Sequence, residues 1–387
     1  MTSRARALLV LPALALLAGL AACTDKEDAA SSGGGAIEVS STAEACELSA
    51  TEAPAGAISF EVTNDGSEVT EFYFLEGERI VSEVENVGPG LTRTLVVEAE
   101  PGEYTAQCKP GMEGDGISEA FTVTEGDEAA AADDPKVAAL LDEATRGYRS
   151  YVADEVATLQ AKTQAFATAY AEGRDDEARA SYADARVHWE RIEPVAESFG
   201  DLDPKLDLRE ADLEDGQTWT GWHRIEKDLW PPADAGYQAL TADERTELSE
   251  QLVADTDDLA GRVAELELTP SQLGNGAKEL LDEVATGKVT GEEEIWSHTD
   301  LWDFQANVDG ARRAFDLLEP ALVERGGEEL AATLDEEFDA VQALLDEQRD
   351  GDGFVAYTAL DEAEVKALAD AVNALAEPLS ELTAVVR

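Results

Sequence analysis

The chain has 387 residues, and its 85 acidic side chains against 28 basic ones give a net charge of −57 at neutral pH. So negative a protein repels a phosphate backbone, which argues against nucleic acid as a partner. The same charge creates a long-range field that attracts cations. The length allows two or three domains. With three histidines and three cysteines in the whole chain, few nitrogen or sulfur metal ligands are available.

The N-terminal segment has the layout of a bacterial export signal. Arg4 and Arg6 precede an apolar run, and small residues stand directly before Cys23. This pattern is typical of lipoproteins, in which the cysteine is acylated and the signal is cut. We therefore predict a lipoprotein signal peptide over 1–22 and a lipid on Cys23 that anchors the chain to the extracytoplasmic face of the cell membrane. The alternative is an ordinary secreted protein. The Ser- and Gly-rich residues 23–36 predict a flexible stalk.

Residues 37–124 alternate between apolar and polar side chains, which is the period of strands. Turn sequences rich in Gly, Pro, Asn and Asp separate the runs, as at 64–66 and 88–90. About seven short strands in this length predict a β-sandwich. The alternating apolar positions include Ile37/Val39, Ile58/Phe60/Val62, Leu95/Val97/Ala99, Tyr104/Ala106/Cys108 and Phe121/Val123. Residues 125–135 are acidic and alanine-rich, and they predict a linker.

From residue 136 to the C-terminus at 387 the apolar period becomes helical. The predicted stripes are Val137, Leu141, Ala144, Tyr148, Val152, Val156 and Leu159; Ala185, His188, Ile192, Val195 and Phe199; and Leu301, Phe304, Val308, Ala311, Phe315 and Leu318. The segments 328–348 and 355–386 continue the pattern. This part is large for a single bundle and consistent with two, so we predict an all-α domain of two packed helical bundles.

The β-domain contains no histidine, which excludes a blue-copper site of two histidines and one cysteine. Its candidate sulfur ligands for a metal are Cys46, Cys108 and Met112, and Glu71 and Glu103 lie near them in the predicted strand pattern. Two interpretations stay open. A Cys46–Cys108 disulfide is the default in an oxidising compartment. A cysteine and glutamate site for copper or iron is the alternative.

The sharpest motif in the helical domain is Gly-Trp-His-Arg-Ile-Glu at 221–226. His223 and Glu226 stand three residues apart, so they share a helix face and can hold one ion. Upstream, Glu190 and Glu193 have the spacing of a carboxylate ladder on one helix face. An ordinary solvated face explains that ladder equally well.

Two further histidines are weaker candidates. His188 lies on an apolar stripe, which favours a histidine satisfied within the core. Glu292–Glu294 with His298 could form a second cation site, but a solvated helix start is the simpler interpretation. Carboxylates with one imidazole suit iron, manganese or zinc better than Cu(I). The sequence has no Ser/His/Asp signature, no H-E-x-x-H and no phosphate-binding glycine loop, so acyl-transfer chemistry is poorly supported.

Three helical segments together carry a family resemblance: 188–197, 219–227 and 299–310. They resemble the EfeO family, the extracytoplasmic component of EfeUOB-type iron uptake systems. The resemblance implies a cupredoxin-like domain followed by an imelysin-like, peptidase-type double helical bundle. It further implies that the protein captures Fe2+ or Fe3+ and delivers it to a membrane permease, and that a haem peroxidase of the same system is a second partner.

The resemblance also implies ligands. In the helical domain it points to the G-x-H-x-x-E motif with acidic co-ligands, here His223, Glu226, Glu190, Glu193, Glu210 and Asp212. In the β-domain it implies cysteine and glutamate ligands, here Cys46, Glu71, Glu103 and Cys108. The metal-site interpretation of the two cysteines thereby becomes as strong as the disulfide. Iron is the expected metal, with copper or zinc as alternatives.

Two other functions remain as hypotheses. Imelysin-like domains have been classed with peptidases, so a metallopeptidase is the first. A catalytic zinc site needs three protein ligands, an open position and a base, and the sequence offers no distinct base. We therefore expect a binding protein and not an enzyme. The second is an adhesion or scaffold module in which the β-domain binds a partner.

Overall fold

The computed structural model describes residues 36–124 and 134–386, apart from residues 78, 100, 113, 115, 214–215, 233–235 and 287. The predicted signal peptide, Cys23 and nearly all of the predicted stalk and linker lie outside the described residues. Among the helices that are described, none combines the length and the apolar character that a membrane crossing requires.

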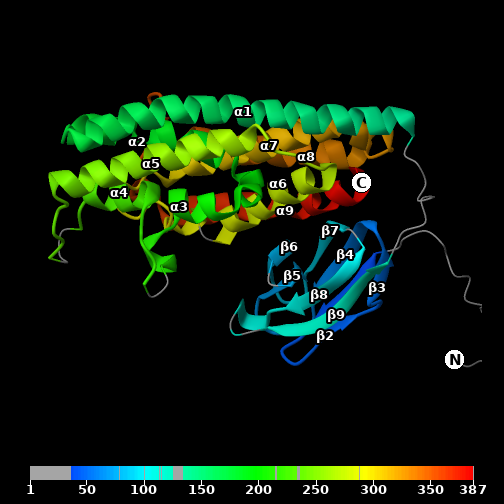
Figure 1. Ribbon diagram of the computed structural model, residues 1–387. Coiled ribbons are helices and arrows are strands. Elements are labelled where there is room, and N and C mark those ends of the chain that lie inside the picture. The colour runs from blue at the N-terminus through cyan, green and yellow to red at the C-terminus, as the bar shows by residue number, and fades with distance from the viewer. Residues whose placement is uncertain are drawn as a thin grey trace, which may run out of the picture. The chain divides into compact units, whose positions relative to one another are not determined.

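The described residues up to 124 form two β-sheets (Figure 1). The first has the order β2-β1-β4-β7 and the second β3-β9-β8-β5-β6. The strands are β1 (Ile37–Ser41), β2 (Cys46–Leu48), β3 (Glu52–Pro54), β4 (Gly56–Asn64), β5 (Thr70–Glu76), β6 (Arg79–Val87), β7 (Thr92–Ala99), β8 (Gly102–Cys108) and β9 (Ile117–Thr124), with a 3-10 turn η1 (Pro110–Met112). The predicted β-sandwich is confirmed.

Alternation places one side of each sheet in the core. Phe60 of β4 lies at the centre, with its ring centroid 5.3 Å from those of Phe72 and Phe74 and 5.5 Å from that of Phe121. All four rings are fully buried. We expected about seven strands, and the described residues up to 124 contain nine, because β2 and β3 have only three residues each and show no alternation.

Cys46 of β2 and Cys108 of β8 form a disulfide that joins the two sheets. Because it closes a loop of 62 residues, replacing both cysteines by serine should lower the free energy of unfolding of the β-domain by about 2–4 kcal/mol. Faster amide hydrogen exchange in β5 and β8 would report this loss. The control is wild-type protein treated with a reductant, which should match the variant. Alkylation of both thiols in unreduced protein would contradict the bond.

The remaining described residues are mainly helical. The elements are α1 (Pro135–Ala171), α2 (Asp175–Glu190), η2 (Glu193–Leu202), α3 (Asp203–Asp207), η3 (Glu210–Asp212), α4 (Gly221–Leu229), α5 (Ala242–Val263), α6 (Pro270–Thr286), η4 (Lys288–Thr290), α7 (Asp300–Glu324), α8 (Glu328–Glu347), β10 (Arg349–Asp350), β11 (Gly353–Phe354), η5 (Tyr357–Ala359) and α9 (Glu362–Val386).

The long helices form two groups that share α7. Helices α1, α2 and α5 pack together, α6, α8 and α9 pack beside α7, and α7 also contacts α1 and α2 (Figure 1). A single hydrophobic cluster runs through both groups. The predicted stripe from Val137 to Leu159 is buried throughout, as expected for a helix covered on one face. The predicted helical double bundle is confirmed.

One predicted helix is wrong in extent. The apolar stripe at 185–199 is buried, but α2 ends at Glu190 and a 3-10 segment follows. Pro194 explains the change, because proline disfavours the α conformation in the residue before it and cannot donate a helical hydrogen bond. Glu190 and Glu193 therefore do not lie on one face of a continuous helix, although both carboxylates contact Lys288 and Asn307.

Candidate metal centre

Helix α4 begins at Gly221, at a point of close backbone contact. Gly221 has a φ of 82°, and a Cβ atom there would lie 2.1 Å from the carbonyl oxygen of Leu206. Only glycine tolerates both the conformation and the approach. The contact packs the first turn of α4 against the end of α3, and it brings His223 beside Asp207.

His223 is buried among four carboxylates, two on each side of its ring. Nε2 lies 3.3 Å from Oε1 of Glu293 and 3.4 Å from Oδ1 of Asp207. Nδ1 lies 3.4 Å from Oε2 of Glu226 and 3.9 Å from Oε1 of Glu294. Each side of the ring thus offers a triad whose donor atoms lie within 4.8 Å of one another. An imidazole with carboxylates is a donor set for a hard or borderline divalent ion, or for Fe3+.

A single guanidinium lies in the middle of this acidic cluster. Arg186 of α2 is wholly buried and forms ion pairs with Glu190, Asp207, Glu293, Glu294 and Asp303. Burial, with help from neighbouring carboxylates, raises the pKa of both Glu294 and Asp303 well above the usual range. One fixed cation therefore does not neutralise the cluster, and the site favours a further positive charge.

His223 has an unusual pKa for a buried imidazole. Burial and the charge of Arg186 would lower it, but Glu226, Glu293 and Asp207 outweigh them and raise the pKa of His223 from 6.5 to about 9. Protonated His223 thus stabilises the fold fully below pH 6.5, and this contribution is lost as the pH rises through about 9.

A metal ion must displace that proton, so binding should depend on pH. Between about pH 6 and about pH 8, we expect the affinity for Fe2+ to rise about tenfold per pH unit for each proton displaced. Anaerobic titration at several pH values measures the slope, and calorimetry in buffers of different ionisation enthalpy counts the protons. A flat profile would contradict a role for His223.

The other predicted helical ligands lie apart from His223. Lys288, which is fully buried, forms ion pairs with Glu190 and Glu193. Glu210 pairs with Lys227, and Asp212 pairs with Arg209 on the exposed η3 turn. None of these four carboxylates belongs to either triad around His223 among the described residues. Cations of the protein pair with all four carboxylates, so their role as ligands rests on the family resemblance alone and stays a prediction.

Sequence reasoning missed one member of the triads and misjudged two others. Nothing in the sequence singles out Asp207. Glu293 and Glu294 were expected on a solvated helix start, but they are buried before α7 and contact His223. His298, expected beside them, belongs to neither triad. His188 is a buried core histidine as expected, with Nδ1 2.5 Å from Glu155, although its Nε2 has no hydrogen-bond partner among the described residues.

The β-domain does not assemble the proposed cysteine and glutamate site. The sulfurs of Cys46 and Cys108 bond to each other, and a disulfide provides no thiolate ligand. Glu103 lies at the opposite end of β8 from Cys108, about 17 Å away along the strand. Glu71 is buried and accepts a hydrogen bond from Tyr73. Of the two interpretations, the structure contains the disulfide.

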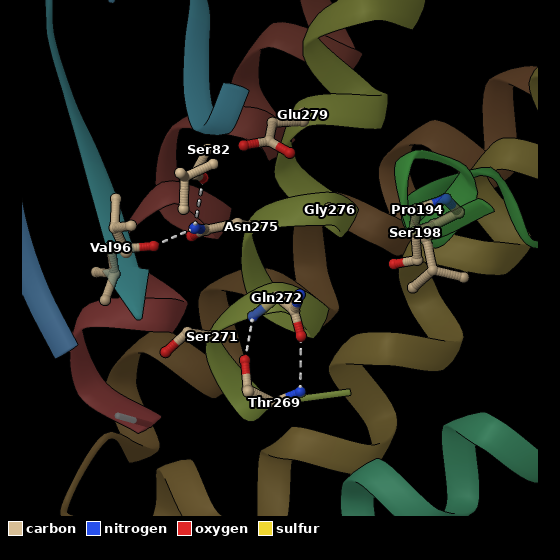
Figure 2. Close-up of a pocket in the computed structure, with 13 residues that line it drawn as sticks. Ser82, Val96, Pro194, Ser198, Thr269, Ser271, Gln272, Asn275, Gly276 and Glu279 are labelled. Carbon is tan, nitrogen blue, oxygen red and sulfur yellow. Dashed lines mark hydrogen bonds between the residues drawn. The ribbon is translucent and has the colours of Figure 1, made fainter. Parts of the chain in front are cut away.

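A cavity of about 270 Å³ lies where β6 and β7 meet η2 and α6. Figure 2 shows Asn275 of α6 pointing to the carbonyl oxygen of Val96, to which its amide donates. Of the residues that line the cavity, only Glu279 is ionisable. The cavity thus offers one ionisable side chain, whereas four carboxylates gather around His223.

Comparisons with known proteins agree with this architecture. A family model described as imelysin, named as a peptidase family, matches residues 144–382, and a cupredoxin-like domain model matches residues 12–117. The iron uptake system component EfeO of Escherichia coli K12 is 37% identical over 90% of this chain and 91% of its own length. The proteins of the same name in Shigella flexneri and in Escherichia coli O157:H7 are 37% and 36% identical over the same shares.

Proposed function

Because this chain belongs to the EfeO family of iron uptake system components, we propose that it binds iron outside the cytoplasm and delivers it to a membrane permease. Iron is the cargo of this proposal and not a resident cofactor. A haem peroxidase of the same system is the second proposed partner. The acidic surface of the chain suits a protein that collects cations.

The cluster around His223 is the observation that carries the proposal. Its donors are one imidazole and the carboxylates of Asp207, Glu226, Glu293 and Glu294, all within 3.9 Å of a ring nitrogen. Hard oxygen donors with a single nitrogen suit Fe2+ and Fe3+, whereas Cu(I) prefers sulfur. Zinc would also fit these donors, and the kinship with iron uptake components is what favours iron over zinc and copper.

A binding role fits the cluster better than peptidase chemistry. A metallopeptidase needs a carboxylate that is free to act as a base toward a metal-bound water. Glu226, the acidic residue of the motif, accepts hydrogen bonds from the backbone N–H groups of Trp296 and Ser297 and from His223. A carboxylate held by three donors is a poor base.

Anaerobic titration of the purified full-length protein with Fe2+ tests the proposal. We expect saturable binding, with metal content checked by elemental analysis. Incubation with denatured protein substrates tests the alternative. Cleavage that is abolished by chelation and by Glu226→Gln would overturn the binding role, and so would failure to bind iron at micromolar concentration.

The proposed location is the outer face of the cell membrane, with the signal peptide 1–22 removed and a lipid on Cys23. In the proposed domain organisation, residues 23–36 form the stalk and residues 125–135 form the linker. We expect Cys23→Ser to abolish incorporation of labelled fatty acid and to shift the protein from the membrane fraction to the medium. Wild-type protein found mostly in the medium would contradict the anchor.

A further inference from the structure

We propose that the ion binds on the Nε2 side of His223, between Asp207 and Glu293, and that Glu226 is a positioning residue which keeps a proton on Nδ1. This inference rests on the proposed metal centre and deepens it. The two nitrogens of an imidazole point in different directions, so one ion bound at the ring uses one side only. The structure offers a triad on each side, and their contacts differ.

Carboxylates on both sides of the ring accept from donors of the protein, but only on the Nδ1 side are two of those donors backbone N–H groups, whereas Asp207 and Glu293 are paired with the side chains of Arg186 and Trp189. Oε1 of Glu226 accepts from the backbone N–H groups of Trp296 at 3.0 Å and Ser297 at 2.7 Å, and its Oε2 accepts from Nδ1. Glu294 accepts from the hydroxyls of Tyr182 and Ser297. Its Oε1 is also 2.7 Å from Nε of Arg186.

On the Nε2 side, the imidazole nitrogen is buried and has no hydrogen-bond partner among the described residues. It nevertheless lies 3.3 Å from Glu293 and 3.4 Å from Asp207. Donors that share one ion at about 2.1 Å lie roughly 3.0–3.4 Å from one another. The separations on this side therefore match those of atoms around a common ion, whereas the 3.9 Å between Nδ1 and Glu294 is too long.

Access also favours the Nε2 side. Asp207 is the one residue of the two triads that is not fully buried. Beyond it, Nη1 of Arg209 lies 3.5 Å from Oε2 of Glu293, and the Arg209 side chain is 29% exposed. Asp207 itself is oriented by the indole N–H of Trp189, which donates to Oδ2 at 2.9 Å. The Nε2 side of the ring is therefore the less deeply buried of the two.

Arg186 can remain in place when the ion binds. Its guanidinium contacts Asp207 and, at 2.7 Å, Oε1 of Glu293. Each carboxylate oxygen has two lone pairs, so one can accept from Arg186 while the other faces the ion. Glu190 and Glu294, at 2.8 and 2.7 Å, continue to balance the guanidinium.

Glu226 then has the role that carboxylates play behind many metal-binding histidines. By accepting from Nδ1–H, it fixes the tautomer and leaves the Nε2 lone pair for the ion. In Glu226→Gln, the two backbone N–H groups require an oxygen at the position of Oε1. The amide NH2 must then face Nδ1, where it acts as a donor and drives the ring proton to Nε2.

Cadmium NMR decides which nitrogen binds. The full-length protein labelled with 15N-histidine contains three imidazoles, and 113Cd2+ alone is the probe. We expect a one-bond coupling between 113Cd and Nε2 of His223, with a proton retained on Nδ1. Coupling to Nδ1 would overturn this inference and leave the metal centre intact. A saturated sample with no coupling at His223 would overturn both.

Variants separate ligands from the positioning residue. Glu226→Gln should lower cadmium affinity about 10–100-fold, yet at saturation the coupling should stay on Nε2 and the Nδ1 proton signal should change. Asp207→Asn and Glu293→Gln should lose more affinity and keep that proton signal. Glu190→Gln, which contacts Arg186 but not His223, is the matched control and should change affinity only a few-fold. An unchanged Nδ1 signal in Glu226→Gln would contradict the positioning role.

Discussion

Replacing His223 by alanine is expected to lower the affinity of the protein for iron by at least about 100-fold. Loss of a residue that only orients a metal ligand costs about 10–100-fold in affinity, and loss of the ligand itself should cost more. His223 supplies the nitrogen of both triads among the described residues. Without it, the carboxylates are left with Arg186 as their nearest cation. Anaerobic titration with Fe2+ measures the loss.

The matched control is His188→Ala. His188 is also a buried histidine with a carboxylate partner, Glu155, but it belongs to neither triad. Its loss should alter stability and leave iron affinity within a few-fold of the wild type. Equal loss of affinity in both variants would indicate a general effect on the fold, and equal retention would place the iron elsewhere.

Replacing Arg186 by methionine is expected to lower the free energy of unfolding of the helical domain by about 3–5 kcal/mol, since it leaves several buried carboxylates without their shared partner. The six tryptophans, at 189, 219, 222, 230, 296 and 302, all belong to the helical domain. Urea unfolding followed by tryptophan fluorescence therefore reports on this domain without a contribution from the β-domain.

A surface arginine provides the comparison for Arg186. Arg312→Met removes ion pairs with Asp316 and Asp335 from a side chain that is 33% exposed, and exposed pairs contribute about 0–1 kcal/mol. A divalent ion should stabilise Arg186→Met more than the wild type, because it supplies the missing positive charge. A variant that is as stable as the wild type would contradict the central role of this guanidinium.

Much of the fold could be predicted from periodicity alone. The stripe from Val137 to Leu159 and the alternation at Phe60 and Val62 both correspond to buried positions. Such patterns are local, so they can be recognised without knowing which segments pack against them. The break after Glu190 was missed because a helical stripe continues through the 3-10 segment, although Pro194 was a visible warning.

The candidate metal centre was harder to predict because its members come from distant segments. His223 and Glu226 are close in sequence and were found. Glu293 looked like a solvated glutamate, since sequence does not reveal that it packs against α4 and Arg186. Glu210 is a candidate because of its position near the motif, and the structure places it at the surface beside Lys227.

The contact between Gly221 and Leu206 gives the linear motif a meaning beyond its own six positions. Glycine at the start of α4 is what lets the helix touch the chain just before Asp207. The motif therefore encodes information about a carboxylate that it does not contain. A larger residue at position 221 would change the distance between His223 and Asp207 without altering either residue. Glycine, the residue of the motif that has no side chain to bind an ion, therefore sets the spacing of the centre.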